Sequence, residues 1–155
     1  MGVIKHFQGL ESTGMSRADA QKQAMEVIRG LRYGKNEYFW INDMTPTMVM
    51  HPTNPKLEGQ NLSGLKDPDG KFLFNDMVAI ARKQGSGQVD YRWPKPGSED
   101  PVPKISYVEL FQPWGWILGS GIYVDDVQVE FREQALRASA IPVSYTHLTL
   151  PTSDL

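Results

Sequence analysis

The fold of this chain is indicated most clearly by residues 102–127, VPKISYVELFQPWGWILGSGIYVDDV. Two runs rich in β-branched and aromatic residues, 104–111 and 114–124, are separated by a Gln-Pro turn and are typical of β-strands. Because strands joined by so short a turn run side by side in opposite directions, the stretch predicts an antiparallel pair. A helical pattern at residues 124–140 follows directly.

Three more strands are predicted upstream. Residues 38–43, YFWIND, and 47–51 flank a turn at Pro46 and form a hairpin, while residues 87–93 form the strand before the opening stretch. About twenty residues of turn chemistry, 52–70, follow the hairpin. A loop of that length in a compact domain is more often functional than decorative.

Helices are predicted at residues 16–34 and 73–84 in addition to the C-terminal one. Ser16 begins the first as an N-cap, with Asp19 three residues later as in a capping box, and Gly34 ends it. The order is helix, two strands, loop with helix, three strands, helix. It indicates an α+β domain with a five-stranded antiparallel sheet, one face of which the terminal helices can cover.

The composition describes one ordinary globular domain. The chain has 155 residues, 40% of them hydrophobic and 22% charged, and its net charge of −2 gives no reason to expect nucleic acid as a partner. It has no cysteine, so disulfides and thiol nucleophiles are excluded. No apolar run approaches the ~18 residues of a membrane-spanning helix, and the N-terminus has no signal-peptide pattern.

No motif predicts catalysis, a metal or a cofactor. The DPDG run at 67–70 lacks the Glu that an EF-hand loop needs at position 12. Gly119 and Gly121 do not have the spacing of a G-x-x-x-x-G-K-[ST] or a G-x-G-x-x-G phosphate-binding loop. They instead indicate a place where a backbone or a ligand approaches the last strand. His6 and His51 have no acidic partner at the spacing of a metal site or a triad.

Cations and aromatic residues together suggest a pocket for a small organic anion. Arg32, Arg92 and Lys104 stand at strand ends or inner faces, and His51 precedes Pro52, where its ring either caps the long loop or lines a site. A carboxylate pocket combines a fixed positive charge, phenol hydroxyls and an apolar aromatic wall. Ordinary strand aromatics and snorkelling cations remain an open alternative. The aromatic residues concerned are Tyr38, Trp40, Tyr91, Trp93, Tyr107, Trp114, Trp116 and Tyr123.

Three runs carry a family resemblance: LRYGKNEYFWINDMTPTMVMHP at 31–52, LEGQNLSGLKDPDGKFLF at 57–74, and the stretch at 102–127. Together they resemble the single Cache sensor domain of bacterial methyl-accepting chemotaxis proteins, over residues 16–138. The resemblance implies a PAS-like fold with a long N-terminal helix on one side of the sheet and a ligand pocket on the other. It also implies a small carboxylate ligand, such as acetate, propionate, pyruvate or lactate, whose binding shifts the C-terminal helix.

The resemblance implies a set of ligand-binding residues, in which Lys104 and Arg32 supply charge and Trp40 faces the methyl end. Lys104 and Tyr107 have opposite parity along a strand, so both reach one pocket only across a bulge or at the strand entry. Alternation puts Tyr38 and Trp40 on one face, which we expect to face the ligand and not the N-terminal helix. The implied set is Arg32, Tyr38, Trp40, His51, Lys104, Tyr107 and Tyr123.

Residues 1–15 are expected to be a truncated lead-in, 16–140 the sensor domain, and 141–155 a non-native tail. The tail is suspected because VSYTHLTLPT, at 143–152, resembles a translated sequencing adapter. Receptors of this family carry a transmembrane helix on each side of the domain. We therefore expect a membrane-anchored parent with this domain in the periplasm, and a homodimer through the N-terminal helix is compatible with it.

Two other readings of the function stay open. The parent can be a sensor histidine kinase, or the domain can be a stand-alone PAS-like binding protein. A PAS-like enzyme is a further alternative, although no cofactor, metal or catalytic residue is expected. The sequence does not name the acid, because one methylene changes discrimination by only about 1–3 kcal/mol in an apolar pocket.

Overall fold

The structure is a computed structural model, and it describes residues 1–139. The suspected tail at 141–155 lies outside these residues. Residues 1–124 form one compact unit, and most of the last helix belongs to a second. The elements are α1 (Gly2–Glu11), α2 (Arg17–Arg29), β1 (Arg32–Tyr33), β2 (Glu37–Asp43), β3 (Met48–Met50), η1 (Pro55–Leu57), α3 (Leu73–Gln84), β4 (Ser86–Pro94), β5 (Pro101–Phe111), η2 (Gln112–Trp114), β6 (Trp116–Tyr123) and α4 (Val124–Ser139).

Within the described residues, the fold is built on one antiparallel sheet of six strands in the order β1-β2-β6-β5-β4, with β3 paired to β2. The hairpin of β5 and β6 pairs from Lys104 with Tyr123 to Phe111 with Trp116, as the opening stretch predicts. The α+β fold with an antiparallel sheet is therefore confirmed. The prediction of five strands omitted β1, which is only two residues long.

The first predicted helix is too long at its C-terminal end. Ser16 is its N-cap and accepts a hydrogen bond from the backbone of Asp19, as predicted. The helix ends at Arg29, however, because the chain then turns back on itself to pair β1 with β2. Gly34 and Asn36, with φ of 55° and 80°, form that turn, so residues 30–34 are not helical.

Residues 1–15, expected as a lead-in, contain a helix that the sequence analysis did not predict. Helix α1 packs beside α2, and its Ile4 is fully buried. The indole N–H of Trp114 donates to the carboxylate of Glu11 at 2.6 Å, which ties the end of α1 to the η2 turn. The long helix expected on one side of the sheet is therefore a pair of shorter helices.

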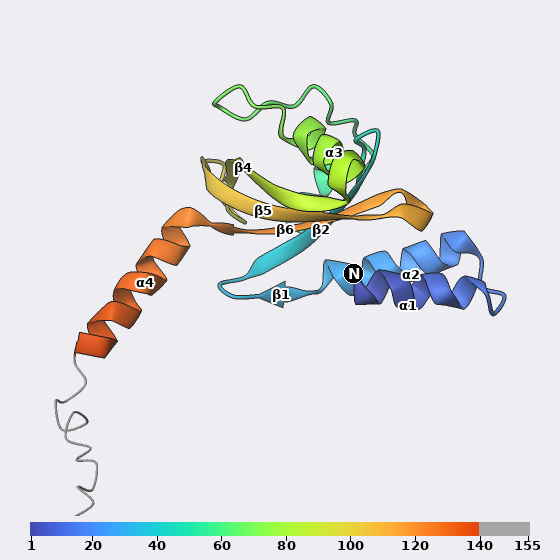
Figure 1. Cartoon of the computed structure of the whole chain (residues 1–155), viewed down its shortest axis with the longest axis horizontal. Coiled ribbons are helices and arrows are strands. Elements are labelled where there is room, and N and C mark those ends of the chain that lie inside the picture. Colours follow the sequence, from blue (N-terminus) through green and yellow to red (C-terminus); the bar gives the residue numbers. More distant parts are fainter. Residues whose placement is uncertain (140–155) are drawn as a thin grey trace, which may run out of the picture. The chain divides into compact units, whose positions relative to one another are not determined.

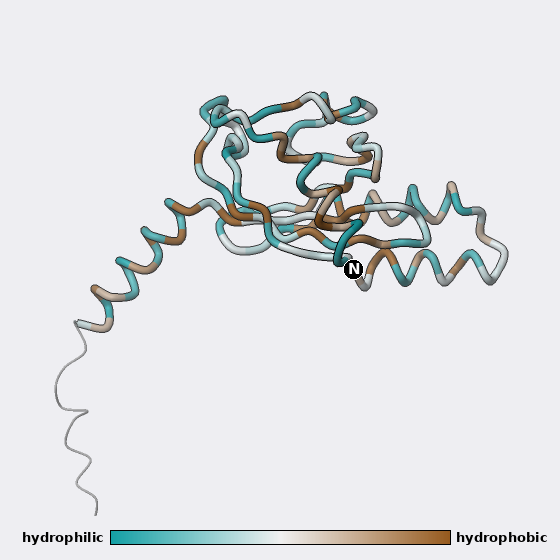
Figure 2. The backbone as a smooth tube through the Cα atoms, turned by 45° about the horizontal axis from the view of Figure 1, so that its top comes forward, coloured by the Kyte–Doolittle hydropathy of each residue, from teal (hydrophilic) through white to brown (hydrophobic). Residues whose placement is uncertain are grey.

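The sheet separates two hydrophobic clusters. Helices α1 and α2 lie on one face and α3 lies on the other (Figure 1). Ile41 of β2 packs with Ala24 and Ile28 of α2, whereas Tyr38 and Trp40 belong to the cluster that contains Phe74 and other α3 residues. Hydrophobic residues accordingly concentrate along the strands (Figure 2). Tyr38 and Trp40 thus face away from α2, as the alternation predicts.

Two glycines of β6 shape the α3 face of the sheet. A Cβ built on Gly119 would overlap the ring of Trp40, and one on Gly121 would overlap the hydroxyl of Ser106. The sequence analysis expected a backbone or a ligand at these glycines: backbone atoms of Ile105 and Ser106 do come close at Gly121, but at Gly119 the neighbour is the side chain of Trp40. They keep the middle of β6 flat, so side chains from β2 and β5 can meet above it.

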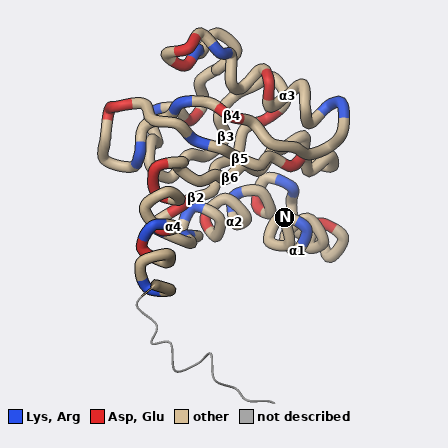
Figure 3. Tube along the Cα trace, turned by 60° about the vertical axis from the view of Figure 1, so that its left-hand side comes forward, with Lys and Arg blue, Asp and Glu red and all other residues tan. Residues whose placement is uncertain are grey.

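Helix α3 has the predicted bounds and ends at Gly85, whose φ of 82° is a left-handed cap. Acidic and basic residues are interspersed along the chain (Figure 3). Helix α4, described by itself, runs for 16 residues. Of the helices found within residues 1–139, none combines the length and the apolar character needed to cross a membrane.

Candidate ligand-binding site

Lys104 of β5 is a buried lysine surrounded by aromatic rings. It is 2% exposed, and its Nζ donates a hydrogen bond to the Tyr38 hydroxyl at 3.0 Å. Nζ also lies 4.3, 5.2 and 5.0 Å from the ring centroids of Tyr38, Trp40 and Tyr123. A cation over the faces of three rings is stabilised by their quadrupoles. We call Lys104, Tyr38, Trp40, Tyr123 and His51 the Lys104 cluster.

Lys104 has hydrogen-bonding capacity that the protein does not use. Burial lowers its pKa to about 7, and the charge of Glu37 opposes this change in part. No carboxylate among residues 1–139 forms an ion pair with Lys104. An ammonium group has three donors, and Tyr38 takes one. The arrangement therefore suits an anion that brings its own negative charge.

His51 follows β3, and its ring lies 5.0 Å from that of Tyr38, centroid to centroid. Burial, helped by the charge of Lys104, lowers the pKa of His51 to about 3, although Glu58 acts in the opposite direction. The ring is therefore neutral near pH 7. Its Nδ1 accepts from the backbone N–H of Asn54 at 3.0 Å, so the proton is on Nε2. That N–H makes no hydrogen bond with residues 1–139 and remains a donor.

The phenols of the site stay protonated. Burial raises the pKa of Tyr38, with hydrogen-bonding groups of neighbouring residues acting in the opposite direction. Burial also raises the pKa values of Tyr123 and Tyr91. Tyr123 donates to the carbonyl of Pro94 at 2.8 Å, and the Tyr91 and Ser106 hydroxyls are hydrogen-bonded at 2.8 Å. The site therefore offers neutral hydroxyls around one titratable cation.

Two residues of the sequence-implied set lie away from this cluster. Arg32 is exposed on β1, and its Nη1 donates to the carbonyls of Arg29 and Leu31, each at 2.8 Å. Tyr107 is 56% exposed on the opposite face of the sheet from Lys104. No bulge interrupts the pairing of β5 with β4 or β6, so strand parity separates Tyr107 from Lys104.

Trp93, Thr53 and Asn54 are not in the set that the resemblance implies, although Trp93 is one of the aromatic residues named for the suggested pocket. Trp93 lies 6.0 Å from the His51 ring, and Thr53 and Asn54 approach His51 Nδ1. Strand alternation could have indicated Trp93. Trp93 and Tyr91 are two residues apart on β4 and so lie on the same face, and Tyr91 pairs with Lys104. Asn54 could not be identified in this way, because its contact is made by the backbone.

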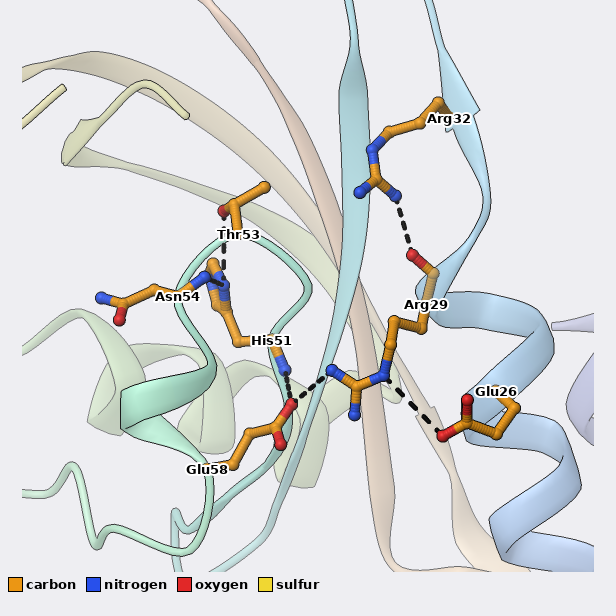
Figure 4. A network of polar contacts seen from close by, with 7 residues as sticks. All are labelled: Glu26, Arg29, Arg32, His51, Thr53, Asn54 and Glu58. Carbon is orange, nitrogen blue, oxygen red and sulfur yellow. Dashed lines mark hydrogen bonds and ion pairs between the residues drawn. The ribbon is translucent and has the colours of Figure 1, made fainter. Parts of the chain in front are cut away.

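A polar network connects helix α2 to the segment that carries His51 (Figure 4). Arg29 Nη1 lies 2.8 Å from Glu58 Oε1, and the same oxygen accepts from the His51 backbone at 3.0 Å. Burial acts to raise the pKa of Glu58, but these hydrogen bonds outweigh it and hold the pKa below its usual value. The loop after β3 is thereby fixed to α2.

The described residues contain no group of three or more His, Asp or Glu that could hold a metal ion. A family model described as Single Cache domain 2 matches residues 2–137. The chain belongs to this family. The Cache domain is 59% identical over 143 residues to the methyl-accepting chemotaxis protein McpP of Pseudomonas putida KT2440, covering 92% of this chain and 26% of that protein. It thus spans about a quarter of the length of this curated relative.

Two solved structures resemble this Cache domain closely. One comes from work on carboxylic acid recognition by a Cache chemosensory domain; it is 63% identical with a TM-score of 0.78, and the match covers 79% of this chain and 84% of that one. The other is a periplasmic sensor domain of a chemotaxis protein, 56% identical with a TM-score of 0.78, covering 79% and 86%. The resemblance stated from the sequence is therefore confirmed.

Proposed function

We propose that this Cache domain is the periplasmic sensor region of a chemoreceptor and binds a small monocarboxylate at the Lys104 cluster. One observation carries the proposal. Lys104 is a buried lysine that forms no ion pair with a carboxylate of residues 1–139, and it is enclosed by Tyr38, Trp40 and Tyr123. Burying a charge without a counter-ion is costly, and a ligand carboxylate would offset that cost.

The chemistry of the cluster fits both ends of a short acid. One carboxylate oxygen would accept from Lys104 Nζ, and His51 Nε2 would donate to the other. Hydrogen bonds between charged partners are about twice as strong as neutral ones, and burial strengthens them further. The face of Trp40 would contact the methyl end. The similar structure studied for carboxylic acid recognition supports the same ligand class.

A route for the signal begins at Tyr123. This residue ends β6, and α4 begins at the next position, Val124. A carboxylate that attracts Lys104 away from the ring of Tyr123 would change the packing of Tyr123 directly before α4. We propose that this change moves the start of α4 and so reaches the membrane-anchored output region. Dimerisation through α2 stays a prediction, which sedimentation with and without acid would test.

We infer that the site binds its ligand and does not transform it. Catalysis by proton transfer needs an acid or base beside the reacting atom whose pKa lies near the working pH. His51 titrates far below pH 7, and Tyr38 and Tyr123 titrate well above it. Lys104, the remaining titratable member of the cluster, is assigned to holding the carboxylate. Proton NMR of bound acids over several hours would reveal any turnover, which would contradict this inference.

Calorimetric titration with acids of two to four carbons tests the proposed function. We expect saturable binding of at least one acid at one site per domain. Lys104→Met should weaken it tenfold or more, as expected for loss of a hydrogen bond to a charged group. The control is Lys83→Met, an exposed lysine on α3, which should stay within twofold. The proposal fails if no acid binds, or if folded Lys104→Met binds as well as the wild type.

A further inference from the structure

A cleft of about 580 Å³ lies outside the Lys104 cluster. Its volume is within the range of small-molecule pockets. Leu57, Leu65 and Trp93 give it an apolar wall, and polar residues line its rim. The full lining is Thr53, Asn54, Leu57, Leu65, Trp93, Pro94, Lys95, Pro96, Gly97, Ser98 and Glu99.

The cleft and the Lys104 cluster share one wall. Thr53 and Asn54 line the cleft and also approach His51 Nδ1, at 3.5 and 3.0 Å. Trp93 lines the cleft as well, and its ring lies 6.0 Å from that of His51. Trp93 therefore contacts the cluster on one side and borders the cleft on the other.

Trp93 is held in this place by other rings. It makes edge-to-face contacts with Phe74 at 5.9 Å and with Tyr91 at 6.3 Å, centroid to centroid. Its backbone is in the β4 ladder, opposite Val102 of β5. A large side chain fixed by packing and by strand pairing acts as a rigid partition, because protein interiors are close-packed and few rotamers are free.

We propose that Trp93 sets the length of the acid by closing the Lys104 cluster off from the adjacent cleft. The inference rests on the proposed function, since the carboxylate is taken to bind at Lys104. An acyl chain that extends from Lys104 past His51 meets the indole of Trp93 after a few carbons. Beyond the indole lie Leu57 and Leu65, which would bury additional methylenes if the partition were smaller.

Substitution of Trp93 should therefore change the preference for chain length. Each methylene that becomes buried strengthens binding about fourfold, so two of them give roughly 15-fold. We expect the ratio of pentanoate to propionate affinity to rise by that order in Trp93→Leu. Trp93→Phe keeps a smaller ring and should give an intermediate rise. Because the ratio is taken within each variant, a general loss of affinity cancels.

The test is calorimetric titration of wild type, Trp93→Phe and Trp93→Leu with propionate and pentanoate, with thermal melting of each protein as a fold control. Leu65→Ser, added to the substituted protein, should lower the raised ratio again. An unchanged ratio in a folded variant that binds propionate overturns the role of Trp93 and leaves the proposed function intact. If the wild type binds neither this pair nor any two- to four-carbon acid, both proposals are overturned. Trp93→Phe alone decides the question if Trp93→Leu does not fold.

Discussion

The ammonium of Lys104 donates to the hydroxyl of Tyr38 at 3.0 Å, although the two residues stand on strands that are not neighbours. Strand β6 lies between β5 and β2. On this face β6 presents Gly119 and Gly121, which have no side chain to fill the space above the strand. A lysine on β5 can therefore reach a tyrosine on β2, and the cluster is built over a gap that glycine leaves.

Replacing Lys104 by methionine should change how stability depends on pH. Burial lowers the pKa of Lys104 to about 7, so the unfolded chain binds its proton more tightly than the folded protein does. The free energy of unfolding of the wild type should therefore rise between pH 7 and 9, by about 2 kcal/mol from this residue. Urea unfolding at both values should show that Lys104→Met loses this rise and Lys83→Met keeps it. Equal rises in both variants would contradict the assignment.

Binding of the acid should weaken above about pH 7. The carboxylate needs the ammonium form of Lys104, whereas His51 is neutral throughout and the phenols stay protonated. The affinity should fall toward tenfold per pH unit above the pKa and change little below it. Titration in two buffers of different ionisation enthalpy should detect proton uptake at pH 8. A constant affinity from pH 6 to 9 would show that Lys104 does not hold the ligand as a cation.

Gly119→Ala should displace the ring of Trp40 and so disturb the Lys104 cluster. The added methyl would overlap the ring of Trp40, which is packed under α3, and overpacking of this kind costs about 1–3 kcal/mol. We expect a lower melting temperature, a change in tryptophan fluorescence and weaker acid binding. Gly64→Ala is the matched control, because its Cβ meets no atom within 4 Å, and its stability should change by about 0.5 kcal/mol or less.

Tyr107 and Tyr38 should respond differently to substitution. Tyr107 is exposed on the far face of the sheet, so Tyr107→Thr should leave acid affinity within twofold. Tyr38→Phe removes the hydroxyl that accepts from Lys104 and should weaken binding about fivefold. Both variants can be titrated under the same conditions. A larger effect at Tyr107 would restore the residue to the site that the resemblance implies.

Local patterns in the sequence predict the fold well where they agree with the tertiary contacts. The helical period of residues 73–84 and the capping glycine predict α3 correctly. Strand alternation places Tyr38 and Trp40 on the α3 face. Gly119 does mark a close approach to β6, although the group that approaches is the side chain of Trp40 and not a backbone or a ligand. In each case the local sequence pattern alone is enough to predict the feature.

The parts that could not be predicted depend on contacts between distant residues. Ile4 of helix α1 is buried because the helix packs on α2, which a short segment of sequence does not reveal. Arg32 resembled a site cation, but the hairpin of β1 carries it to the exposed edge. Trp93 is one of many aromatic residues on strands, and only its position between His51 and the outer cleft gives it a distinct role.

The most direct test of the central claim is a crystal structure of the domain with the acid that binds most tightly. The account predicts a carboxylate oxygen within about 3.2 Å of Lys104 Nζ, with the second oxygen facing His51 Nε2 and the alkyl end against Trp40. An acid bound elsewhere, with Lys104 Nζ still hydrogen-bonded only to Tyr38, would contradict it.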